Sequence, residues 1–100
     1  MIIISEKHIV KAEHRKAFIK IRKAFAEKVQ REGARIIFTC DADNENIFYT
    51  WAEHDTEELA SEIFESGVVQ EMMGKIGTFL ADTPHIRRLY ISKTETIMTT

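Results

Sequence analysis

The chain has 100 residues, 44% apolar and 30% charged, which is typical of one globular domain spanning residues 1–100. Its 14 basic and 16 acidic residues are mixed and give a net charge of -2, so no basic stripe indicates a nucleic-acid partner. No apolar run approaches the roughly 20 residues of a membrane span, and the opening MIII is too short for a signal segment, so we expect a cytoplasmic protein without a membrane partner.

The first half of the chain predicts a strand, a helix and a β-hairpin. Apolar residues recur every three or four positions between Phe18 and Val29, the period of an amphipathic helix. A glycine follows this pattern, where a residue free to adopt positive φ commonly ends a helix. The elements expected are a strand over Ile2–Val10, a helix over 13–32 ended by Gly33, a strand over Arg35–Cys40, a polar turn over 41–46 and a strand over Ile47–Glu53.

The second half predicts a broken helix and a last strand. Asp55, followed three residues later by Glu58, resembles a capping box that starts a helix. A further helical stretch runs to about Leu80, and Pro84 ends it because the residue before a proline disfavours α geometry. The remaining expectations are a helix break at Ser66 and Gly67, a last strand over 86–91, and a polar tail after Ser92 that either extends this strand or frays.

This order of elements predicts an α+β fold of the ferredoxin-like βαββαβ type, a four-stranded antiparallel sheet with helices on one face. The other face then needs a cover. Apolar residues occupy both sides of the strands in Ile2–Ile4, Ile36–Phe38 and Ile47–Phe48, whereas a sheet with one wet face would alternate. Two sheets packed face to face in a homodimer would bury the surplus. The alternative is a monomer with a few exposed apolar residues.

In this layout the chain resembles the antibiotic biosynthesis monooxygenase branch of the dimeric α+β barrel superfamily. The resemblance covers residues 2–92 and is carried by the stretches IIISEKHIVKAEHRKAF, DADNENIFYTWAEHDTEEL and SGVVQEMMGKI. It implies a dimeric α+β barrel and a cofactor-independent oxygenase that acts on a small aromatic or quinol-type molecule.

The chain departs from this family pattern at two places. Members usually have Glu, any residue, Trp on the third strand, whereas this sequence reads Trp51, Ala52, Glu53. Haem-degrading relatives have a His just after the stretch that matches SGVVQEM. The corresponding position of this chain lies near Met73 and holds no His. The absence of that His counts against haem degradation, although His8 or His85 could serve as a different ligand.

His8 is the candidate catalytic residue. It shares a strand face with Glu6, and a nearby carboxylate can fix the tautomer of an imidazole and raise its pKa, which suits a general base. The alternative is a partly exposed strand histidine without a role in catalysis.

Five further residues are candidates for substrate binding. Tyr49 and Trp51 share one face of the third strand and could stack on an aromatic ligand, or they could be core or interface residues. Met72, Met73 and Phe79 could line an adaptable pocket, or form a plain core stripe of the helix.

The sequence predicts no metal site and no bound cofactor. No pair of histidines has ligand spacing, and Cys40 is the only cysteine, which excludes an internal disulfide. No glycine-rich phosphate loop follows a strand. Three functions therefore stay open: a cofactor-independent monooxygenase, a haem-binding or haem-degrading protein, and a non-catalytic dimeric ligand-binding or stress-response module.

Overall fold

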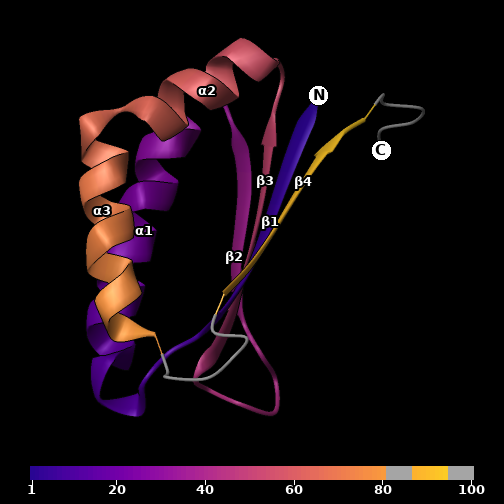
Figure 1. Ribbon diagram of the computed structural model, residues 1–100. Helices are drawn as coiled ribbons and strands as arrows, with labels where there is room; N and C mark the ends of the chain where they lie inside the picture. The colour runs from indigo at the N-terminus through magenta and orange to yellow at the C-terminus, as the bar shows by residue number, and fades with distance from the viewer. Residues whose placement is uncertain (81–86, 95–100) are drawn as a thin grey trace.

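The computed structural model describes residues 1–80 and 87–94 of the chain, folded as one sheet with helices on one of its faces (Figure 1). The elements in chain order are β1 (Ile2–Ile9), the short 3-10 helix η1 (Ala12–His14), α1 (Arg15–Arg31), β2 (Arg35–Cys40), β3 (Ile47–His54), α2 (Glu57–Glu65), α3 (Gly67–Phe79) and β4 (Arg87–Lys93).

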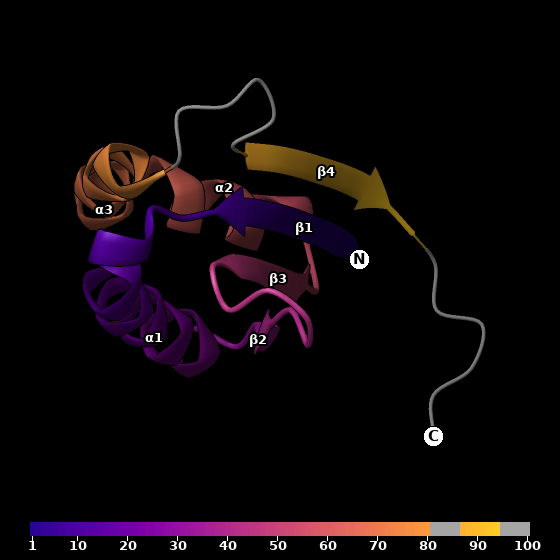
Figure 2. The ribbon, with the colours of Figure 1, turned by 90° about the horizontal axis from the view of Figure 1, so that it is seen from below.

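The sheet has the strand order β2-β3-β1-β4, and each neighbouring pair is antiparallel. Helices α1 and α3 lie along the same face of the sheet, and α2 crosses above one end of it (Figures 1 and 2). The expected α+β ferredoxin-like arrangement is therefore confirmed. In the described chain no element covers the opposite face of the sheet, which we call the open face (Figure 2).

Helix α1 begins and ends close to the predicted bounds. A 3-10 turn precedes it, and Gly33 follows its end with a φ of 96°, which confirms the predicted glycine stop. The backbone N–H of Gly33 donates to the carbonyl of Gln30, and that of Ala34 donates to the carbonyl of Val29. These bonds satisfy carbonyls that have no partner inside the helix.

The predicted capping residue of α2 was wrong by one position. Thr56 rather than Asp55 precedes the helix, and its hydroxyl accepts a hydrogen bond from the backbone N–H of Leu59 at 3.2 Å. Asp55 instead accepts a hydrogen bond from Arg35 at 3.4 Å, which draws its side chain away from the helix start. The predicted break is confirmed, because Ser66 separates the two helices and caps α3 through the N–H of Val69.

The last strand extends to Lys93, in agreement with one of the two expectations for the residues after Ser92. Its pairing with β1 continues because the backbone N–H of Thr94 donates to the carbonyl of Met1 at 2.9 Å. The predicted start at Ile86, the stop at Pro84 and the tail from residue 95 lie outside the described residues.

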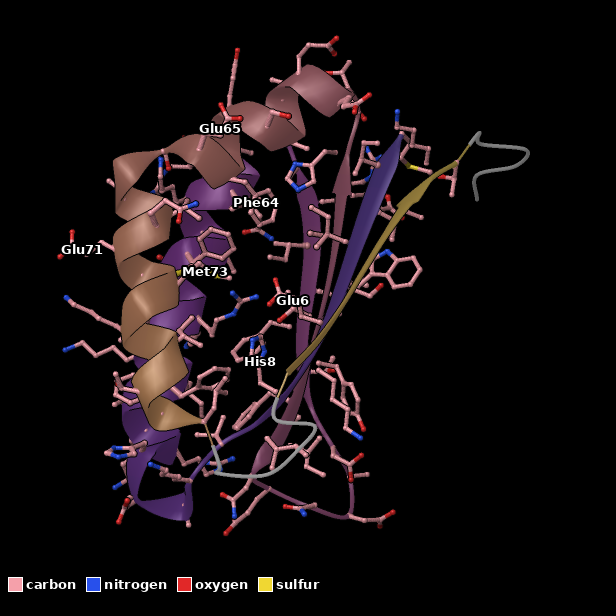
Figure 3. All side chains as sticks on the ribbon, in the orientation of Figure 1. Glu6, His8, Phe64, Glu65, Glu71 and Met73 are labelled. Atoms are coloured by element: carbon pink, nitrogen blue, oxygen red, sulfur yellow. The ribbon has the colours of Figure 1, made fainter. Side chains whose placement is uncertain are left out.

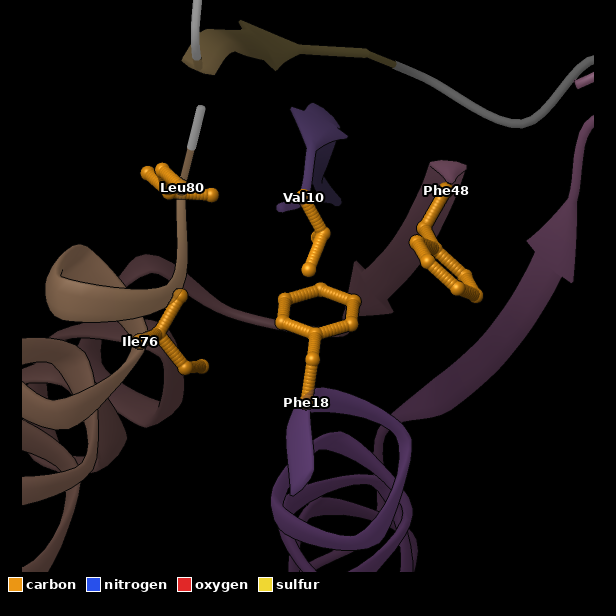
Figure 4. Close-up of a cluster of buried hydrophobic side chains, with 5 residues drawn as sticks. All are labelled: Val10, Phe18, Phe48, Ile76 and Leu80. Atoms are coloured by element: carbon orange, nitrogen blue, oxygen red, sulfur yellow. The ribbon is translucent and has the colours of Figure 1, made fainter. Parts of the chain in front are cut away.

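The core fills the layer between the sheet and the helices. Phe18 has no exposed surface and packs against apolar side chains from both layers. Its ring centroid lies 4.9 Å from that of Phe48. The cluster around it, drawn in Figure 4, consists of Val10, Phe18, Phe48, Ile76 and Leu80.

The helices of the described residues are all too short or too polar to span a membrane.

Candidate functional site

The candidate site lies on β1, on the face that the helices cover. Alternate residues of this strand are buried, as the twofold repeat of a strand requires. Glu6 and His8 occupy the buried positions between Ile4 and Val10, where apolar side chains would be expected. Figure 3 shows both side chains pointing from β1 toward the helix layer. A histidine and a carboxylate are thus held in the interior of the domain.

These two residues belong to a buried group that we call the inner polar cluster: Glu6, His8, Arg22 and Thr50. His8 Nε2 lies 3.2 Å from Glu6 Oε2, and Arg22 Nη2 lies 3.9 Å from Glu6 Oε1. Arg22 Nη2 also donates a hydrogen bond of 2.9 Å to Thr50 Oγ1. The Glu6 carboxylate therefore lies between an imidazole and a guanidinium. Burying charge is costly unless it is paired in this way.

Two aromatic rings pack against the inner polar cluster, and all four of its members are buried from water. The ring centroids of His8 and Phe18 lie 5.4 Å apart, and the guanidinium of Arg22 lies 5.0 Å from the ring centroid of Phe25. His8 has no exposed surface. In such surroundings each electrostatic interaction is stronger than it would be in water. A proton moved at this place would be controlled by a few fixed groups.

Three of the predicted substrate-binding residues lie in the same layer as His8. Met72 and Phe79 are half-buried and pack against the cluster around Phe18. Met73 is also half-buried, packs against a neighbouring core cluster, and points from α3 toward the sheet (Figure 3). The structure therefore brings these three side chains to the side of the sheet on which His8 lies.

The other two predicted binding residues, Tyr49 and Trp51, lie on the open face, with 38% and 44% of their surface exposed. In the sheet register they pair with Lys7 and Ser5, the outward-facing positions of β1. Within one chain they therefore do not share a pocket with His8. Together with Ile37, which is 60% exposed, they form the apolar centre of the open face.

Both aromatic side chains on the open face are held by carboxylates. The hydroxyl of Tyr49 donates to Asp41 at 3.0 Å, and this hydrogen bond raises the pKa of Tyr49. The indole N–H of Trp51 donates to Glu53 at 3.3 Å. Glu53 also accepts a bond of 2.6 Å from Arg35, which lowers the pKa of the carboxyl. Tyr49 is thus neutral near pH 7 and, like Trp51, is fixed against the sheet.

His54 ends β3 on the helix-covered face and gives a prediction about pH. Burial lowers the pKa of His54 from its ordinary value of 6.5, with a smaller opposing effect of Asp55. The pKa of His54 is thus lower in the folded chain than in the unfolded chain, where it is near 6.5, and between these two values the unfolded chain binds more protons. The contribution of neutral His54 to stability is therefore fully present above pH 6.5 and is lost as the pH falls through the folded-state pKa. From about pH 7.5 to about pH 5.5 we expect the Tm of the native chain to fall more than that of His54→Gln.

Thermal unfolding of the two proteins at both pH values measures this difference in Tm. The effects of the other histidines on Tm cancel because both proteins contain them. Equal losses in Tm would show that His54 takes up its proton as easily in the folded chain as in the unfolded one.

Two members of the inner polar cluster, Arg22 and Thr50, were not among the site residues predicted from the sequence. Arg22 follows Phe18 by four residues and precedes Phe25 by three, so it lies on the apolar stripe of its helix. Thr50 alternates with Phe48 and Ala52 on the buried side of β3. A polar residue at a core position is a usable signal for a functional site.

The inner polar cluster contains the groups that an acid–base reaction needs. An imidazole can take up a proton, a neighbouring carboxylate can stabilise the resulting imidazolium, and a guanidinium can offset negative charge. Among the described residues no group of three or more His, Cys, Asp or Glu side chains is arranged to hold a metal ion.

Several solved structures share this fold over nearly the whole chain. One from Deinococcus radiodurans, named as a candidate antibiotic biosynthesis monooxygenase, has a TM-score of 0.86 at 13% identity and covers 100% of this chain and 98% of its own. One from Nitrosomonas europaea with the same description has a TM-score of 0.80 at 19% identity, covering 94% and 98%. A conserved protein from Methanosarcina mazei has a TM-score of 0.81 at 20% identity, covering 94% and 92%.

No protein-family model matches the chain, and no curated protein matches its sequence significantly. The solved structures nevertheless confirm, in the three-dimensional fold, the resemblance to antibiotic biosynthesis monooxygenases that was first seen in the order of elements. Identities of 10–20% in these structures leave the chemistry to be argued from the residues of this chain.

Proposed function

We propose that the chain is an oxygenase that uses dioxygen to oxidise a small, acidic aromatic substrate of the phenol or quinol type, with His8 as the general base. The observation that carries this proposal is the buried contact of His8 with Glu6, backed by Arg22, in the layer between sheet and helices. The names of the structures that share the fold support the same reaction class.

The proposed reaction needs no oxidant besides dioxygen. His8 removes a proton from an activated CH₂ group next to the phenolic ring, which leaves a carbanion that transfers electrons to dioxygen and forms a carbon–peroxide bond. Cleavage of the O–O bond leaves one oxygen atom as the new carbonyl, and the other leaves as water with the two hydrogens of the CH₂ group. The substrate supplies all four electrons that reduce dioxygen.

The residues around His8 have separate roles in this proposal. Glu6, 3.2 Å from the imidazole, stabilises its protonated form after the first step. The guanidinium of Arg22 lies 3.9 Å from Glu6 and places positive charge near the developing carbanion. Because His8 has no exposed surface, substrate entry requires side chains to move, and Met72 and Met73 are suited to this because thioether side chains are flexible.

Oxygen uptake by the purified protein tests the proposal. The substrates are anthrone-like polyphenols, which contain the required CH₂ group, and the variants are His8→Ala, His8→Gln and the matched control His14→Ala, which changes a half-buried histidine of η1. We expect uptake by the native chain and by His14→Ala, and a loss of about 10²–10⁴-fold in both His8 variants.

Equal uptake by folded His8→Ala would remove His8 from the reaction. No uptake by the native chain with any substrate, together with saturable binding of the same compounds, would replace the oxygenase by a ligand-binding module. A Soret band shift in a haem titration, lost in His8→Ala, would favour a haem protein instead.

We also propose that two copies of the chain pack their open faces together as a homodimer. The open face is apolar at its centre, where Ile37 and Trp51 are neighbours in the sheet register. An exposed patch of this kind on an otherwise covered sheet is typical of an interface. The carboxylates that hold Tyr49 and Trp51 fix both rings in place and so reduce the entropy lost on association.

Trp51→Asp is expected to convert the dimer to a monomer, because it places a charge at the centre of the buried interface. Val68→Asp is the matched control, since Val68 is 62% exposed but lies at the start of α3, away from the open face. Sedimentation equilibrium of both variants measures the result. A dimer that survives Trp51→Asp unchanged would place the interface elsewhere.

A further inference from the structure

Two helices carry rows of like charge on their exposed sides. Lys16, Lys20 and Lys23 form a row on α1, and Glu58, Glu62 and Glu65 form a row on α2. Within each row the spacings are three and four residues, so the side chains lie on one side of the helix. Among the described side chains none of these six takes part in an ion pair, whereas other surface charges do, such as Lys28 with Glu32 at 2.6 Å and Lys93 with Glu57 at 2.9 Å.

One end of each row works against the stability of its own helix. Lys16 lies in the first turn of α1, which has no acidic residue, and Glu65 ends α2, whose last turn has no basic residue. Positive charge at a helix N-terminus and negative charge at a C-terminus oppose the helix dipole. Like charges four residues apart also repel. Residues that break local rules in this manner often serve a contact outside the element.

The two rows also have complementary apolar parts. A shallow hollow on α1 is lined by Lys16, Ile19, Lys20, Lys23, Ala24 and Glu27, of which Ile19 and Ala24 are the apolar members. On α2, Leu59 is 38% exposed and stands next to Glu58. One surface is therefore a hollow with a basic rim, and the other is an apolar side chain among acids. Figure 3 shows Glu65 pointing away from the body of the domain.

We propose that α2 of one copy of this chain docks on α1 of another copy, with the lysine row against the glutamate row and Leu59 over Ile19 and Ala24. The helices run antiparallel, which places Lys16 beside Glu65 and Lys23 beside Glu58. This direction relieves both unfavourable helix ends and aligns the two helix dipoles favourably. Each row spans eight residues, or seven steps of about 1.5 Å and about 10 Å along its helix, so the lengths match.

The occupant is a second copy because the chain itself supplies both complementary surfaces. The contact uses neither the open face nor the inner polar cluster, so it goes beyond the proposed homodimer and enzyme. If the sheet-mediated dimer forms, docking joins dimers into larger assemblies, and a contact between two different surfaces builds a ring or a chain unless it is reciprocal.

Charge reversal tests the proposal directly. One variant carries Lys16→Glu, Lys20→Glu and Lys23→Glu, and the other carries Glu58→Lys, Glu62→Lys and Glu65→Lys. At about 20 mM salt we expect the native mass in sedimentation equilibrium to be at least double that of either variant, and about 0.5 M salt to abolish the difference. Mixing the two variants should restore the native mass, because each then offers the other a complementary row.

Three controls keep the outcome decisive. Lys11→Glu with Arg31→Glu and Lys75→Glu changes the net charge as much as the lysine-row variant does but leaves both rows intact, and it should keep the native mass. Both row variants should keep the native circular dichroism and Tm, since all six positions are exposed and substitutions at such positions usually change stability little. Trp51→Asp, tested alone, should leave the salt-sensitive association of α1 with α2 intact. This result would distinguish the helix contact from the interface between the sheets.

Equal masses for the native chain and both row variants at low salt would overturn the proposal. The same holds if the mixture of variants stays at the mass of its parts, or if the row-intact control loses its association.

Discussion

Glu6→Leu is expected to lower the free energy of unfolding by about 3–5 kcal/mol, because it removes one partner from a buried ionic cluster. The carboxylate lies 3.2 Å from His8 and 3.9 Å from Arg22, and all three side chains are buried. Without it, the guanidinium of Arg22 keeps its hydrogen bond to Thr50 but loses its counter-charge. Urea unfolding monitored by circular dichroism measures the change.

The double variant Glu6→Leu with Arg22→Met should regain most of this loss, since replacing a whole buried ion pair by apolar side chains of similar size is often neutral or stabilising. Glu32→Gln is the control. It breaks the exposed pair with Lys28, and exposed pairs are worth about 0–1 kcal/mol. A double variant as unstable as Glu6→Leu alone would show that packing rather than charge dominates at this place.

The double variant also bears on function. If it is stable but takes up no oxygen with a substrate that the native chain oxidises, the charged cluster is retained for its chemistry and not for the stability of the fold. Such a trade of stability against activity is common at functional sites.

The periodicity of the sequence was sufficient to predict the fold. The apolar stripe of α1, the break at Ser66 and the turn after β2 are local signals, and each appears in the structure close to its predicted residues. The errors lie at element ends, such as the cap at Thr56. There Asp55 accepts a hydrogen bond from Arg35, which is distant in the sequence, while Thr56 caps the helix.

The candidate site could be predicted only in part. Alternation along one strand shows which of its residues share a face, but not which residues of the next strand lie on that same face. Glu6 and His8 share a face by alternation alone. Whether Tyr49 joins them depends on the sheet register, which pairs it with Lys7 and so turns it to the open face. Arg22 reaches the cluster from a helix, and no spacing within β1 could reveal it.

Phe18→Ala is expected to lower the free energy of unfolding by about 3–5 kcal/mol, the range for truncating a fully buried aromatic side chain. Phe18 has no exposed surface and connects the layers of the domain, since its ring lies 4.9 Å from that of Phe48 and 5.4 Å from that of His8. Removing it leaves an unfilled space beneath α1, which the sheet and helix can close only in part.

Phe18→Leu keeps most of the volume and is expected to cost less than half as much, and Phe79→Ala, at a half-buried position on the edge of the same cluster, gives a second comparison. Urea unfolding of the three variants measures their free energies of unfolding and so ranks the three losses. Because the ring also packs against His8, Phe18→Leu should lower oxygen uptake more than its small loss of stability explains. If Phe79→Ala destabilised the chain as much as Phe18→Ala, Phe18 would not be the centre of this core, and the position of His8 would have to depend on other contacts.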